Sequence, residues 1–175
     1  MIEFKQIYEN DTEIVNELTP LWINYMRELY INELNIQKES DETITEWLHE
    51  RVKIQGQRES MHFECILDDG VLIGFGFYAL DLGGIRGIID PGFGYIMEMY
   101  IVPNFRRKKY GTRMYEHMVE NLKKDGASLI YLTPDTESGV PFWKRIGFTD
   151  SGKIDPDNKM PIYIKEFSIN DYQKS

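Results

Sequence analysis

The sequence predicts an α+β fold with six to seven strands and about four helices. Short apolar segments typical of strands alternate with longer segments whose apolar residues recur every three or four positions, which is typical of amphipathic helices. An Asp-Gly turn at residues 68–70 joins two of the strand segments and predicts a hairpin. At 175 residues the chain can bury a substantial core and needs no second domain, so we expect one domain over residues 1–175.

The expected strands and helices follow in order along the chain. Strands are predicted at residues 2–8, 62–67, 71–80, 95–102, 128–133 and 160–167, and a further strand begins at Phe148. The first helix is capped by Asn10 or Asp11, and Thr19-Pro20 marks either a kink or a fresh helical start. Ser40 caps a second helix that ends around Gln55-Gly56.

Between Tyr95 and Leu122 a buried strand leads into a basic turn and then a helix. Residues 95–102 are apolar on both alternating faces, which predicts a central strand covered on two sides, and Glu98 is its only charge. Pro103 ends the strand because proline cannot donate to the ladder. Four cations at residues 106–109 follow, and apolar residues then recur at helical spacing from Tyr110 to Leu122.

The four cations lie at the wrong end of the predicted helix, because its amino end already carries partial positive charge from unpaired N–H groups. Backbone N–H groups and basic side chains that converge at a helix start form a site for a phosphate or pyrophosphate. The alternative is a solvated basic patch that happens to fall there. The pattern favours an anion at this helix start.

One segment resembles the acyl-CoA motif of the GNAT superfamily of N-acetyltransferases, namely Ile101-Val102-Pro103-Asn104-Phe105-Arg106-Arg107-Lys108-Lys109-Tyr110-Gly111. The family pattern is Arg or Gln, two residues, Gly, one residue, then Gly or Ala. Arg106 and Gly111 match its first and last positions, and Lys109 replaces its first glycine. A lysine backbone can still present its N–H there if the position is helical rather than left-handed.

A second segment, Pro141-Phe142-Trp143-Lys144-Arg145-Ile146-Gly147-Phe148, resembles the late helix of the same family. Gly147 is the expected helix stop and Phe148 the start of the next strand. The resemblance covers roughly Met61 to Phe167, and two motifs in the right order are more specific than either alone. It implies the GNAT fold, a mostly antiparallel central sheet that splays beside the strand before the basic turn.

The resemblance also implies acetyl-CoA as co-substrate. In the family, free backbone groups of the splayed strand hold the pantetheine arm and the basic turn holds the phosphates. Carried onto this chain, the expected cofactor-binding residues are Met99, Tyr100, Ile101, Arg106, Arg107, Lys108, Lys109, Tyr110, Gly111, Thr112 and Trp143.

Acyl transfer to an amine requires a base, a donor for the developing oxyanion and a way for the thiolate to leave. Glu98 is the candidate general base, directly or through a water, because desolvation on an apolar strand raises a carboxylate's pKa. The alternative for Glu98 is a structural carboxylate bonded to a neighbouring backbone group or hydroxyl. The resemblance implies the Met99 N–H as oxyanion donor.

The general acid is the least defined part of the site. Many family members have a tyrosine where this chain has Trp143, and an indole N–H cannot protonate a thiolate in this pH range. Trp143 is therefore expected to be packing or pocket wall. Tyr163 or Tyr131 could supply the acid instead, and Tyr163 is the candidate general acid.

The expected function is an N-acetyltransferase that moves an acetyl group from acetyl-CoA to a primary amine of a small molecule or peptide, by direct attack through a tetrahedral intermediate. The alternative is a non-catalytic acyl-CoA or anion-binding module of the same fold. Residues 10–58 carry more acidic than basic side chains together with Trp22, Tyr25 and Tyr30, which either attract a cationic amine or simply form ordinary amphipathic helices.

Composition limits the remaining function classes. A net charge of −9 makes general nucleic-acid binding unexpected. The single cysteine, Cys65, and the three histidines show no zinc-type spacing, so we expect no metal site and a core role for Cys65. The longest nearly apolar run, residues 71–80, is half the roughly 20 residues of a spanning helix. A cytoplasmic protein without membrane partner is expected, and a homodimer is expected only from the family resemblance.

Overall fold

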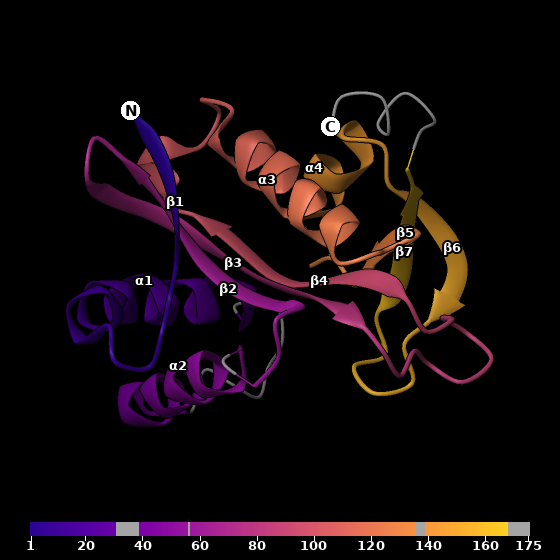
Figure 1. Ribbon diagram of the computed structural model, residues 1–175, viewed down its shortest axis with the longest axis horizontal. Coiled ribbons are helices and arrows are strands. Elements are labelled where there is room, and N and C mark those ends of the chain that lie inside the picture. Colours follow the sequence, from indigo (N-terminus) through magenta and orange to yellow (C-terminus); the bar gives the residue numbers. More distant parts are fainter. Residues whose placement is uncertain (31–38, 56, 136–138, 168–175) are drawn as a thin grey trace. The chain divides into compact units, whose positions relative to one another are not determined.

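The computed structural model describes residues 1–30, 39–55, 57–135 and 139–167 (Figure 1). Its elements are β1 (Ile2–Gln6), α1 (Thr12–Tyr30), α2 (Asp41–Gln55), β2 (Met61–Asp68), β3 (Val71–Asp81), β4 (Phe93–Ile101), the 3-10 helix η2 (Pro103–Phe105), α3 (Tyr110–Lys124), β5 (Leu129–Leu132), α4 (Gly139–Arg145), β6 (Thr149–Ile154) and β7 (Pro161–Glu166). All predicted strands and helices are present, and the α+β class is confirmed. Gly56 lies outside the described residues, as does the side chain of Tyr30.

The strands form one seven-stranded mixed sheet in the order β1-β2-β3-β4-β5-β7-β6. Pairs β1–β2, β5–β7 and β6–β7 are antiparallel, whereas β4 and β5 are parallel. In the described residues the β4–β5 ladder consists of Gly94 with Ile130 and Tyr95 with Tyr131. This ladder is short and ends at Tyr95, before the part of β4 that leads into the basic turn.

The chain divides into two compact units. The first contains residues 1–77 and 98–115, and the second contains residues 78–97 and 116–175. Strands β3 and β4 and helix α3 contribute residues to both. One acetyltransferase domain over the whole chain stays a prediction. Within the described ranges, none of the helices has the length and apolar character needed to cross a membrane.

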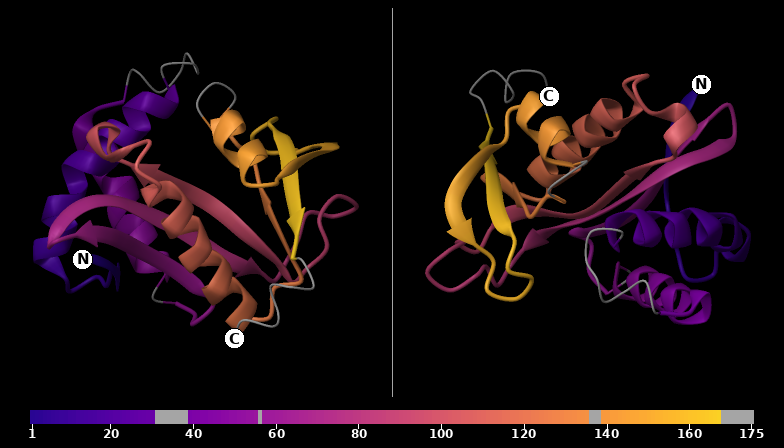
Figure 2. Two further views of the ribbon diagram at one scale, coloured as in Figure 1. Left: turned by 90° about the horizontal axis from the view of Figure 1, so that it is seen from above. Right: turned by 180° about the vertical axis from the view of Figure 1, so that it is seen from behind.

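In the first unit, α1 and α2 lie side by side against the face of β2 and β3 that carries the aromatic core (Figure 2). Trp22 of α1 is fully buried, with ring centroids 5.5 Å from Phe75 and 6.2 Å from Phe63. Its Nε1 donates to the carbonyl of Ile44 at 2.9 Å, which joins α1 to α2. Aromatic packing of this kind stabilises beyond the area that it buries.

Helix α1 continues through Pro20, so a fresh helical start at Thr19-Pro20 is wrong. Proline removes the donor for the carbonyl four residues earlier, that of Asn16. Both Pro20 and Asn16 are exposed, so water can satisfy that carbonyl and the helix is not forced to end.

Cys65 is a core residue, as expected. Its side chain is fully buried in β2, and its Sγ contacts the carbonyl oxygen of Lys5 on β1 at 3.4 Å. Burial raises the pKa of this thiol to about 11, so it stays protonated near neutral pH.

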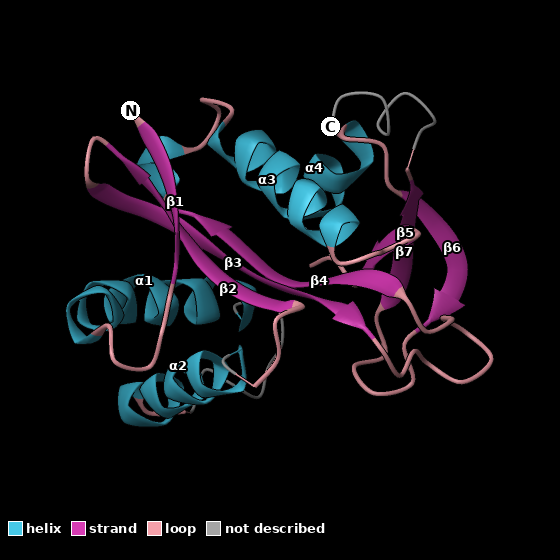
Figure 3. Cartoon of the chain, in the orientation of Figure 1, coloured by secondary structure: helices cyan, strands magenta, loops and turns pink. Residues whose placement is uncertain are grey.

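The second unit contains the β5–β7–β6 part of the sheet, the carboxyl-terminal part of α3, and α4 (Figure 3). Gly126 ends α3 with φ 95°, and Gly147 ends α4 with φ 101°. These are left-handed positions that glycine adopts without steric cost, and the prediction that Gly147 stops a helix is confirmed. The next strand, β6, begins at Thr149, one residue after the predicted start at Phe148.

Candidate active site

The carboxyl end of β4 turns into α3 through a short and well-bonded connection in the first unit. The Val102 N–H donates to the Ile73 carbonyl of β3 at 2.9 Å, which extends the pairing one residue past β4. Pro103 opens η2, where its missing N–H costs nothing, and the Arg106 N–H returns to the Pro103 carbonyl at 3.1 Å. The prediction that Pro103 ends the strand is confirmed.

The basic turn contains two residues in the left-handed region. Arg107 has φ 64° and Lys109 has φ 68°, and the Lys109 carbonyl accepts the Arg113 N–H at 3.0 Å at the start of α3. Lys109 is therefore left-handed and not helical, a conformation that glycine adopts without steric cost. Turns with left-handed residues bring successive N–H groups together into a concave site for an anion. The residues present thus fit a pyrophosphate.

Replacing Lys109 with glycine should raise the free energy of unfolding by about 1 kcal/mol, because a left-handed residue with a Cβ costs about 1–2 kcal/mol. Denaturant unfolding measures the change. Lys108→Gly is the matched control, since Lys108 has no positive φ, and it should lower stability instead. Equal effects of the two substitutions would contradict strain at Lys109.

The guanidinium of Arg106 is bonded within the protein. Its Nε donates to the Ile101 carbonyl and its Nη2 to Glu28 Oε2 of α1, both at 2.7 Å. It also lies over the Tyr100 ring, 5.2 Å from the centroid, and the Tyr100 hydroxyl donates to Glu28 Oε1 at 2.9 Å. Burial, together with Glu28, raises the pKa of Tyr100 to about 12. These contacts fix the shape of the turn.

Other side chains of the turn and of the first turn of α3 are more accessible. Arg107, Lys108 and Lys109 are exposed, and the Lys108 Nζ lies 5.2 Å from the centroid of the Phe105 ring. The Tyr110 hydroxyl donates to Asp68, and this hydrogen bond raises the pKa of Tyr110. Gly111 and Thr112 are half-buried in the first turn of α3, where N–H groups lack intrahelical partners.

Glu98 is buried in β4, 9% exposed, and its two carboxylate oxygens differ in environment. Oε1 accepts the Nε–H of Arg51 from α2 at 3.1 Å. Oε2 is buried and has no hydrogen-bond partner among the described residues. Burial raises the pKa of Glu98 to about 7, and Arg51 opposes part of that rise. A buried carboxylate oxygen without a partner, on a group with this pKa, makes Glu98 a candidate general base.

Sequence reasoning missed Arg51, although a signal for it exists. The buried stripe of α2 contains Ile44, Leu48, Val52 and Gln55. Arg51 follows Leu48 by three residues and precedes Gln55 by four, so it lies on that stripe. A basic residue on the buried stripe of a helix requires an acidic partner, and the partner is Glu98. The alternative of a backbone or hydroxyl partner for Glu98 is not what the structure contains.

The segment that follows Glu98 lies very close to β3. A Cβ added to Gly74 would meet the Tyr100 carbonyl oxygen at 2.2 Å and Ile101 Cδ1 at 2.8 Å. Tyr100 and Ile101 are buried, whereas Met99 between Glu98 and Tyr100 is half-buried. Only glycine allows this approach of the two strands.

The remaining candidates lie in the second unit. Trp143 is buried in α4, with its ring 5.3 Å from Phe148 and edge-on to it, as expected of a packing residue. Tyr163 is buried in β7, and its ring centroid is 6.0 Å from the Lys144 Nζ. The Tyr131 hydroxyl donates to Asp81 at 2.7 Å, and its pKa is raised by burial and by that carboxylate. Across the described ranges, no cluster of three or more His, Cys, Asp or Glu side chains could bind a metal ion.

The comparisons with known proteins agree with this geometry. An uncharacterized N-acetyltransferase of Methanocaldococcus jannaschii is 31% identical over 77 residues, which cover 43% of this chain and 34% of that relative, so the match spans about a third of the relative's length. The coenzyme A complex of the PaiA N-acetyltransferase of Thermoplasma acidophilum has a TM-score of 0.68 at 19% identity, covering 95% of this chain and 99% of that one. An aminoglycoside 6'-acetyltransferase of type Ii has a TM-score of 0.67 at 16% identity, covering 94% and 96%.

At these identities the solved structures show a shared fold. The model of the acetyltransferase (GNAT) family matches residues 23–148, which is most of the chain and includes both Glu98 and the basic turn. The chain belongs to the GNAT acetyltransferase family.

Proposed function

We propose that the protein is an N-acetyltransferase that moves an acetyl group from acetyl-CoA to a primary amine of a small molecule or peptide. The observation that carries this proposal is Glu98, a buried carboxylate with a pKa of about 7 and an unpartnered Oε2 in the described chain. A general base is most effective when its pKa lies near the working pH. Glu98 also lies on the strand that leads into the basic turn.

The basic turn and the start of α3 form the proposed site for the pyrophosphate. The left-handed Arg107 and Lys109 are proposed to bring successive backbone N–H groups together around the anion, and the side chains of residues 107–109 are exposed cations. Tyr110, Gly111 and Thr112 add the unpaired N–H groups of the helix start. Arg106 is proposed to stabilise the conformation of the turn, because its guanidinium donates hydrogen bonds to Glu28 and to the Ile101 carbonyl.

The splayed part of β4 is the proposed site for the pantetheine arm. Because the ladder with β5 stops after Tyr95, backbone groups of Met99, Tyr100 and Ile101 are proposed to bond the arm instead. The Met99 N–H is the proposed donor to the carbonyl oxygen of the thioester, where negative charge develops during attack. Acetyl-CoA supplies the acetyl thioester.

In the proposed reaction Glu98 takes the proton that the amine loses as its nitrogen bonds to the carbonyl carbon, directly or through a water. The carbon–sulfur bond then breaks, and the thiolate takes a proton. Tyr163 is the proposed donor, because the Tyr131 hydroxyl is already bonded to Asp81. The indole N–H of Trp143 does not ionise near neutral pH, which excludes Trp143 as the general acid. Trp143 is proposed instead as a wall beside the cofactor.

An amine acceptor is supported by the family and by one structural relative, whose name states that it acetylates an aminoglycoside. The acidic excess of residues 10–58 is compatible with a cationic amine.

A calorimetric titration of acetyl-CoA, with coenzyme A as comparison, tests the binding step. We expect micromolar affinity and, with a panel of amines, amine-dependent release of free thiol. Binding without release for every amine would favour the non-catalytic acyl-CoA-binding module. Absence of binding would overturn both the enzyme and that module.

A further inference from the structure

We propose that Arg51 is a positioning residue for the proton transfer: it holds Oε1 of Glu98, so that Oε2 is the oxygen that receives the proton. This inference rests on the proposed function, in which Glu98 is the base. The Arg51 Nε–H donates to Oε1 at 3.1 Å, and Oε2 is buried without a partner in the described chain. A carboxylate held at one oxygen cannot rotate freely, and the other oxygen keeps a fixed direction.

The guanidinium of Arg51 is itself held in place. Its Cζ lies 5.9 Å from the centroid of the Phe77 ring on β3, and the side chain is 32% exposed. An arginine that rests on an aromatic face and donates to a carboxylate has few alternative orientations. The ion pair of Arg51 and Glu98 therefore joins α2 to β4.

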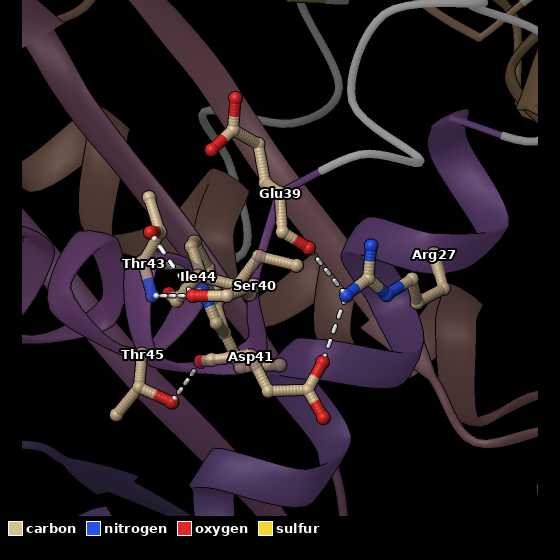
Figure 4. A network of polar contacts seen from close by, with 8 residues as sticks. Arg27, Glu39, Ser40, Asp41, Thr43, Ile44 and Thr45 are labelled. Atoms are coloured by element: carbon tan, nitrogen blue, oxygen red, sulfur yellow. Dashed lines mark hydrogen bonds and ion pairs between the residues drawn. The ribbon is translucent and has the colours of Figure 1, made fainter.

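Helix α2, which carries Arg51, is anchored at its amino end by a network of polar contacts (Figure 4). Ser40 Oγ accepts the Thr43 N–H at 3.2 Å, so Ser40 caps the helix as predicted. From α1, Arg27 Nη2 donates at 2.8 Å to both the Glu39 carbonyl and Asp41 Oδ1. These contacts tie the start of α2 to α1, about three helical turns before Arg51.

Arg51 is the charged group that faces Glu98. Two residues further along β4, the Tyr100 hydroxyl is bonded to Glu28, which in turn pairs with Arg106. Among the described residues, Arg51 is the one ionisable group that acts on the pKa of Glu98. The cation favours the ionised carboxylate and opposes the desolvation of β4. Without Arg51, Glu98 would stay protonated to higher pH.

The test compares pH profiles of kcat/KM for the wild type, Arg51→Met and Arg51→Lys. In Arg51→Met the midpoint of the rising limb of the pH profile should move up by about one pH unit. This lowers the rate at pH 7 about fivefold, because the ionised fraction of Glu98 falls from about one half to about one eleventh, and the rate recovers at high pH. In Arg51→Lys the rising limb of the kcat/KM profile should stay near the wild-type pH, because the positive charge is kept. The plateau of kcat/KM at high pH should be lower, because the fixed Nε–H is lost. Lys53→Met is the control, since Lys53 is exposed on the same helix and carries the same charge.

A carbon-13 NMR titration of the Glu98 carboxyl, assigned with Glu98→Gln, separates this inference from the proposed function. A higher titration midpoint in Arg51→Met supports the inference. If no amine is turned over and the midpoint still rises, the proposed function fails while the Arg51–Glu98 coupling stands. An unchanged midpoint, or a limb that moves equally in Lys53→Met, would overturn the inference. If Arg51→Met does not fold, an Arg51→Lys variant with the wild-type plateau would overturn it.

Discussion

Glu98→Gln is expected to lower kcat by about 10²- to 10³-fold, the usual contribution of a general base. Glutamine has nearly the same shape and its amide oxygen can still accept the Arg51 Nε–H, so the fold and acetyl-CoA affinity should be unchanged. Wild-type activity should rise with pH through about 7, because the base works only when deprotonated and Glu98 has a pKa of about 7. The variant should lack that limb.

Steady-state thiol release between pH 5.5 and 8.5 gives kcat and its dependence on pH, and calorimetry gives the affinity for acetyl-CoA. Glu64→Gln is the matched control, because Glu64 is also a strand carboxylate buried in the first unit. It should leave the pH profile in place. Wild-type turnover in Glu98→Gln at every pH would remove Glu98 from the mechanism, and loss of acetyl-CoA binding would point to misfolding instead.

Gly74→Ala is expected to lower the free energy of unfolding by about 3 kcal/mol, at the upper end for an overpacked site. The added Cβ would lie 2.2 Å from the Tyr100 carbonyl oxygen, and a backbone atom cannot swing aside as a flexible side chain does. Strand β4 must move away from β3. Because Tyr100 and Ile101 carry the proposed pantetheine contacts, acetyl-CoA affinity should fall together with stability.

Thermal and denaturant unfolding measure the first effect, and calorimetry on the folded variant measures the second. Gly83→Ala is the control: its Cβ would meet only the Asp81 side chain at 3.8 Å, and Gly83 has no positive φ. It should change stability by less than about 1 kcal/mol. Wild-type stability and affinity in Gly74→Ala would show that β3 and β4 do not require this close approach.

Local signals explain which parts of the fold were predictable from the sequence. The hairpin turn depends on Asp69 and Gly70, whose φ angles of 49° and 78° suit an Asp-Gly turn. Ser40 caps the start of α2 and Gly126 ends α3, and each affects only the few residues beside it. The apolar strand before Pro103 depends only on its own composition. Each of these features is decided within a few residues, so a single sequence contains the information.

The side-chain partners in the site depend on contacts between distant residues. Glu98 was identifiable as an isolated charge on an apolar strand, but Arg51 is 47 residues away along the chain. Glu28 is 78 residues from Arg106, and nothing near either residue indicates the pair. The sequence therefore singled out Glu98 as a candidate base and residues 106–109 as a basic turn, and tertiary packing determined what each of them contacts.

Lys109 shows the opposite failure, in which a local rule was outweighed. A lysine prefers the helical region, yet the connection between β4 and α3 requires a left-handed residue at this point. The ends of the turn are fixed by Val102, paired with Ile73, and by the start of α3. Those longer-range contacts outweigh the preference of one side chain.

Because Cys65 is buried, thiol-reactive reagents are well suited to assays on this protein. It is the single cysteine of the chain, and a buried thiol with a pKa of about 11 reacts slowly with electrophiles. Thiol reagents can therefore follow coenzyme A release with little background from the folded protein. The same reagents modify Cys65 only when an opening of the first unit exposes it, so the slow labelling rate measures how often such openings occur.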